Sequence, residues 1–147
     1  MVFLLLCGVS GLLASCTAVE NKPTERPVET AITVTDAWIR PGIDPTAVYM
    51  TITNTGDRPI TLAAASAAWA QSVGIHQTVD QDGFMVMEHA DSITVPAHGT
   101  VVLRPGGYHL MAEGIDSKIG AGDSVDLEFT TGDARRIPVT AEARPVG

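Results

Sequence analysis

The stretch "AVYMTITNTGDRPITL", residues 47–62, contains the pattern that decides the fold class. Its first half alternates in polarity and places Val48, Met50 and Ile52 on one face of an expected strand, because successive strand side chains point to opposite faces. Residues 54–59, "NTGDRP", are typical of a turn, and a second apolar run follows them. The stretch therefore predicts two strands joined by a short turn.

The same pattern recurs along the chain from about Ala31 onward, where short apolar or alternating runs are separated by Gly, Pro, Asp or Asn. In "SVDLEFT", residues 124–130, Val125, Leu127 and Phe129 alternate with acidic residues, which is typical of a half-buried strand. Helical periodicity is not sustained anywhere, and "AAASAAWAQS", residues 63–72, is the one candidate for a helical turn. Many short strands at regular spacing predict an all-β fold, specifically an antiparallel β-sandwich.

Length and composition limit the protein class. The chain has 147 residues, 45% of them hydrophobic, which fits one domain with an attached terminal segment. The net charge of −8 excludes a nucleic-acid-binding protein of the usual kind, because such proteins need a basic surface.

The N-terminal segment predicts export. Residues 1–16, "MVFLLLCGVSGLLASC", are apolar and uncharged, and too short for an ordinary transmembrane span. The ending "LASC" resembles the lipobox of bacterial lipoproteins, which implies lipidation of Cys16, although the positive charge that normally starts a signal is missing. An uncleaved hydrophobic terminus, or a secretory signal with a chance cysteine, is the alternative. Residues 17–30 are polar and predict a tether, so the expected domain is 31–147, extracytoplasmic and lipid-anchored to a membrane.

Both cysteines, Cys7 and Cys16, lie in this N-terminal segment. The domain itself therefore has no thiol for a disulfide, a redox motif or a metal site. This argues strongly against an electron-transfer cupredoxin, whose copper site requires a cysteine ligand.

A second stretch, "GGYHLM" at residues 106–111, carries the chemistry. His109 and Met111 would share one face of a strand. Together with His76 and Met87 they form the spacing H-x10-M-x21-H-x-M. Imidazole and thioether donors without thiolate favour Cu(I) over hard ions and over zinc.

This motif resembles that of the periplasmic copper chaperones called PCu(A)C. The segments "AWIRPGIDPTAVYMTITNTGDRPITL" (37–62) and "TVVLRPGGYHLMAEGI" (100–115) are also similar to that family, although Gln77 stands where some members have a methionine. The resemblance implies a cupredoxin-like, Ig-like Greek-key sandwich that carries copper, Cu(I) in preference to Cu(II). It also implies a copper-accepting partner, either a cytochrome c oxidase subunit with its copper A centre or a thiol-bearing assembly factor.

The remaining His and Met residues have weaker claims. Met85 and His89 are auxiliary ligand candidates because each is two residues from Met87 and would therefore lie on the same face of a strand. Met50 is expected in the core, and His98 is expected to be a free, exposed turn residue. A copper buffer or tolerance protein and a non-metal envelope interaction module remain alternatives, and no nucleophile or oriented base predicts an enzyme.

Overall fold

The computed structural model describes residues 31–116 and 118–145, and within these ranges the protein is all-β, as predicted. The expected signal segment, Cys16 and the tether lie outside the described residues. The strands are β1 (Ile32–Ile39), β2 (Thr46–Asn54), β3 (Ile60–Ser66), β4 (Ala70–Gln81), β5 (Phe84–His89), β6 (Ile93–Val95), β7 (Thr100–Leu103), β8 (Tyr108–Ile115), β9 (Ser124–Thr131) and β10 (Arg136–Ala143).

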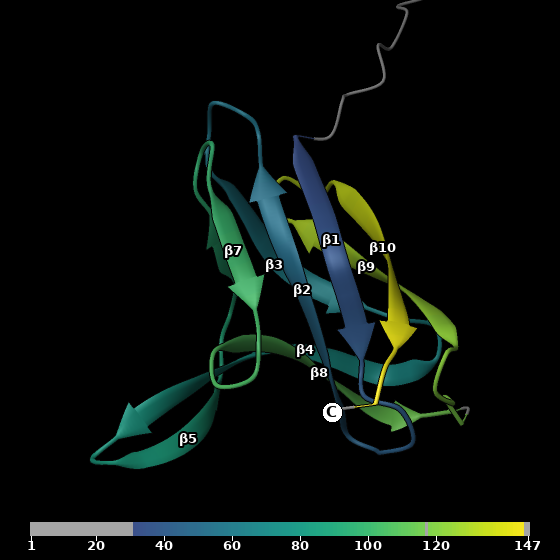
Figure 1. The fold of residues 1–147 in the computed structure, drawn as a ribbon. Coiled ribbons are helices and arrows are strands. Elements are labelled where there is room, and N and C mark those ends of the chain that lie inside the picture. The colour runs from purple at the N-terminus through teal and green to yellow at the C-terminus, as the bar shows by residue number, and fades with distance from the viewer. Residues whose placement is uncertain (1–30, 117, 146–147) are drawn as a thin grey trace, which may run out of the picture.

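All strands belong to one sheet, in the order β5-β4-β8-β2-β1-β10-β9-β3-β6, with β7 paired to the distal half of β2. A further pair, Ala65 with Val73, connects β3 to β4 and closes seven of the strands into a barrel-like ring. The β4–β5 hairpin extends to one side of the body formed by β1, β2, β9 and β10 (Figure 1). Its outer strand, β5, is therefore an edge of the sheet.

The predicted antiparallel sandwich is wrong in two respects. The sheet is mixed, because β1 and β10 pair in parallel, through Trp38 with Glu142 and Ile39 with Ala143. The strands also form one continuous sheet that curls into a ring, whereas a sandwich has two separate sheets. Period-2 alternation places one face of each strand inward in either architecture, so it does not distinguish them.

The core follows the predicted faces. Val48, Met50 and Ile52 are buried on β2, and Leu127 and Phe129 are buried on β9. Met50 is thus a core residue, as expected. The alanine-rich stretch predicted as a helical turn instead completes β3 and then forms a turn at residues 68–69. Strand β3 pairs with β9 on one side and with β4 and β6 on the other.

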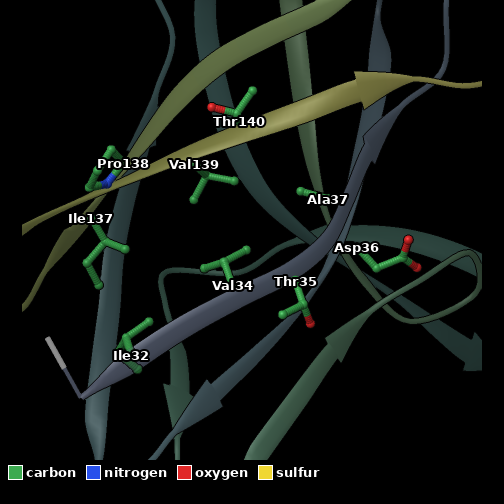
Figure 2. Close-up of a pocket in the computed structure, with 9 residues that line it drawn as sticks. All are labelled: Ile32, Val34, Thr35, Asp36, Ala37, Ile137, Pro138, Val139 and Thr140. Carbon is green, nitrogen blue, oxygen red and sulfur yellow. The ribbon is translucent and has the colours of Figure 1, made fainter. Parts of the chain in front are cut away.

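A hollow of about 310 Å³ separates β1 from β10. The two strands pair only at their C-terminal ends. The pairing of β1 with β2 shifts in register between Thr35 and Trp38, where Asp36 has a positive φ. Val34 and Val139 point toward one another across this hollow (Figure 2). The hollow is therefore a consequence of the bulge in β1.

Candidate metal centre

Three histidines lie side by side across β5, β4 and β8. In the strand register His76 pairs with His89 on one side and with His109 on the other. Paired residues in adjacent strands project to the same face, so the three imidazoles form a row, here called the His row. The face is opposite to that of the buried Ile75 and Leu110. The alternation of faces along each strand did not predict that the three rings would be neighbours.

Adjacent rings of the His row are close neighbours. The centroids of His76 and His109 are 5.9 Å apart, and those of His76 and His89 are 5.5 Å apart with the rings nearly perpendicular. Tyr49 and Trp38 continue the row beyond His109, at centroid distances of 6.4 and 4.5 Å in turn. Aromatic side chains therefore flank the buried end of the His row, and solvent borders its β5 end.

The double glycine before His109 explains how that imidazole is held. Gly106 has a φ of +75°, which a glycine adopts readily in a tight turn, and the Gly107 amide donates to the Arg104 carbonyl. The Gly107 carbonyl lies 3.1 Å from His109 Nδ1. A carbonyl only accepts, so Nδ1 carries the proton and donates, which leaves Nε2 with a lone pair for a metal. His109 is buried, which restricts its ring to this orientation.

The surroundings of His76 favour its neutral imidazole, which is the form that binds a metal cation. Burial lowers the pKa of His76, the imidazoles of His109 and His89 lower it further, and the carboxylate of Glu113 opposes them. A lower pKa keeps the ring neutral to more acidic pH. Protons therefore compete less with a metal at His76 than at an ordinary surface histidine.

Met111 completes one side of the site. It lies two residues after His109 on β8, on the same face, and pairs with Gly74 of β4. A Cβ placed on Gly74 would lie 3.0 Å from His76 Nε2 and 3.8 Å from His89 Nδ1. The missing side chain of Gly74 therefore leaves a space bordered by two ring nitrogens, next to the methionine opposite.

Met87 lies on the other side of the His row. It pairs with Thr78, two residues after His76, and shares the face of His89 on the edge strand. Diagonal neighbours of this kind are within reach of long side chains, although Met87 is 53% exposed. Met85 pairs with Asp80, one step further from His76, so it is placed as a neighbour of the site.

The described residues, 31–116 and 118–145, contain no group of three His, Cys, Asp or Glu already arranged to hold a metal ion. Binding would therefore combine imidazole with thioether donors or require ring rotation. His98 lies elsewhere: it is an exposed turn residue, as predicted, but it is not free, because its Nε2 is 2.8 Å from Asp57 Oδ1.

Sequence reasoning missed two residues that shape the site. Gly74 was not singled out, because the sequence does not show which side chains border the space at a glycine within a strand. The contact between Tyr49 and His109 was also missed, since it depends on β2 and β8 being neighbours.

We expect Gly74→Ala to weaken copper binding about 10-fold while preserving the fold, because the added methyl would displace the His76 ring as an altered ligand orientation does. The φ of Gly74 is not positive, so the substitution adds no backbone strain. Competition with a chromophoric Cu(I) chelator measures the effect. Gly132→Ala is the matched control, because its new Cβ would make only ordinary contacts with Thr61.

Comparison with known proteins identifies the family of the chain. Residues 32–143 match the family described as "Putative lipoprotein LpqE-like". A protein named "Putative lipoprotein Lxx21020", from Leifsonia xyli subsp. xyli, is 28% identical over 142 residues, which cover 95% of this chain and 84% of that protein. Within the described residues no helix is long and apolar enough to cross a bilayer.

Two solved structures share the fold. CuI-DR1885 from Deinococcus radiodurans, solved in solution, is 30% identical with a TM-score of 0.61, and the match covers 86% of this chain and 85% of that one. The copper-bound PCuAC domain from PmoF2 superposes with a TM-score of 0.66 over 79% of this chain and 94% of that domain, at 22% identity. The chain therefore belongs to the LpqE-like family, and its fold is that of a PCuAC domain.

Proposed function

We propose that this protein is an extracytoplasmic, lipid-anchored carrier of Cu(I), with His76, Met87, His109 and Met111 as ligands. One observation carries the proposal: His76 and His109 are direct neighbours on one sheet face, and Met111 borders the space beside them. A set of imidazoles and thioethers is soft and neutral, as Cu(I) prefers. Cu(I) is the cargo of such a protein, and no catalytic step is assigned to it.

The position of the site favours transfer over storage. Met87 and His89 lie on an exposed edge strand, so an acceptor can reach the metal from that side. Ligands without thiolate bind Cu(I) less strongly than the cysteines of an acceptor would, so stepwise ligand exchange runs toward the acceptor. The relationship to DR1885, whose solution structure was solved with Cu(I), supports the same cargo.

Met111→Leu tests the ligand set directly. This substitution keeps the volume of the side chain and removes the sulfur, so we expect Cu(I) affinity to fall about 10-fold with the fold unchanged. The measurement is a titration of the full-length protein in detergent against a chromophoric Cu(I) competitor. Met85→Leu is the control, because Met85 lies further from His76 on the same face. Equal affinities for wild type and Met111→Leu would remove Met111 from the site.

The recipient we propose is the copper A centre of cytochrome c oxidase, or a thiol-bearing assembly factor upstream of it. Mixing the Cu(I)-loaded protein with an apo copper A domain should transfer the metal, and the appearance of the copper A absorption after oxidation would report it. No net movement of copper would contradict delivery to this acceptor. A copper buffer or tolerance role, by contrast, predicts that deletion causes sensitivity to excess copper while oxidase activity under copper scarcity is retained.

A further inference from the structure

We propose that His89 supplies a third imidazole, and that His89, His76 and His109 form a nitrogen-donor set for Cu(II) that overlaps the Cu(I) set. This inference rests on the proposed function and extends it, because it gives the site a second oxidation state of copper as ligand. The two sets share His76 and His109. They differ in whether the thioethers or His89 complete the coordination.

The strand register carries the first part of the argument. His89 is the direct cross-strand partner of His76, and His76 is the direct partner of His109. His76 is therefore the middle of the row and has an imidazole on each side. Met87 is only a diagonal neighbour of His76, since its own cross-strand partner is Thr78. On backbone placement alone, His89 is nearer to His76 than Met87 is.

The space above Gly74 carries the second part. The Cβ position that Gly74 leaves empty lies 3.0 Å from His76 Nε2 and 3.8 Å from His89 Nδ1. A nitrogen of each ring thus borders the same space. On the far side of His76, His109 keeps Nε2 available because its Nδ1 is bonded to the Gly107 carbonyl. Each imidazole of the row therefore has a nitrogen that can bind a metal.

His89 can adapt to a metal because little surrounds it. It is an exposed residue at the end of β5, an edge strand of the hairpin that extends from the body of the protein (Figure 1). The rings of His76 and His89 meet at 86°, and their centroids are 5.5 Å apart. Exposed side chains change rotamer on the nanosecond timescale, so rotation of His89 toward His76 is rapid.

Donor chemistry assigns the oxidation state. Imidazole suits Cu(II) in tetragonal sites with nitrogen and oxygen ligands, whereas thioethers favour Cu(I). His76, His89 and His109 would hold Cu(II) through nitrogen donors alone. Oxidising compartments outside the cytoplasm also favour Cu(II). A protein with both donor sets would offer Cu(I) its thioethers and Cu(II) its third imidazole on the same His row.

The test compares His89→Ala with wild type in both oxidation states, using Cu(I) and Cu(II) alone as probes of the full-length protein in detergent. We expect Cu(II) affinity, measured by competition with glycine, to fall about 10-fold or more, and Cu(I) affinity to change less than about 3-fold. Pulsed electron paramagnetic resonance should count one fewer imidazole on Cu(II) in the variant.

His98→Ala is the matched control, because His98 is an exposed histidine that contacts Asp57 outside the His row, and its loss should leave both affinities unchanged. Unchanged Cu(II) affinity and an unchanged imidazole count in His89→Ala would overturn the proposal. An equal loss for Cu(I) and Cu(II) would overturn the assignment of His89 to the Cu(II) set. A wild-type protein that ignores Cu(I) but binds Cu(II) through His89 would instead refute the proposed Cu(I) function and leave this inference standing.

Discussion

His76→Ala is expected to lower the affinity for Cu(I) by about 100-fold or more, since removing a direct ligand costs at least as much as disturbing its outer-shell partners. His76 is the residue at which the two neighbouring imidazoles meet, through cross-strand pairs with His89 and His109. Its Nε2 is the nearer of the two ring nitrogens that border the space above Gly74. Titration against a chromophoric Cu(I) chelator measures the loss, and the same variant should also lose Cu(II).

The fold of His76→Ala should remain intact, because His76 is only half-buried and lies on the face away from the core. Circular dichroism and urea unfolding check this, with the free energy of unfolding expected to change by about 1 kcal/mol or less. His98→Ala is again the control, because it removes a histidine that lies outside the His row. A folded His76→Ala protein that binds Cu(I) within about 3-fold of wild type would contradict the site, since direct ligands cannot be so dispensable.

Asn54→Ala is expected to lower the free energy of unfolding by about 3 kcal/mol, because it removes the hydrogen bonds that one fully buried amide side chain makes to the backbone, including the buried carbonyl of Val95. Asn54 is fully buried at the end of β2. Its Nδ2 donates to the carbonyls of Arg58 and Pro96 at 2.8 and 3.0 Å, and its Oδ1 accepts from the Gly56 amide at 2.9 Å. The side chain therefore joins the turn after β2 to the end of β6.

Urea unfolding measures this loss, and an unchanged slope against denaturant would show that the compactness of both states is retained. Asn54→Leu, close in volume, separates lost hydrogen bonds from lost packing and should be similarly destabilised. Thr53→Ala is the matched control on the same strand, because its hydroxyl contact with Thr100 is exposed and contributes little. A loss below about 1 kcal/mol for Asn54→Ala would mean that water replaces these bonds.

Local periodicity was enough to predict the strands and their inward faces. The alternation that places Val48, Met50 and Ile52 together acts over neighbouring residues, and all three are buried in the structure. The same local rule placed His109 and Met111 on one face of β8, and the spacing to His76 and Met87 indicated the family.

By itself, then, the sequence determined an all-β domain, its inward faces, and the donor types of the proposed metal site, imidazole and thioether without cysteine. Only the tertiary structure decided the parallel pairing of β1 with β10, and the strand order that places His76 between His89 and His109. It also revealed the space at Gly74 and the carbonyl that orients His109. The physical reason is that strand pairing joins segments far apart in the chain, and period-2 alternation specifies the face of a strand without specifying its neighbour.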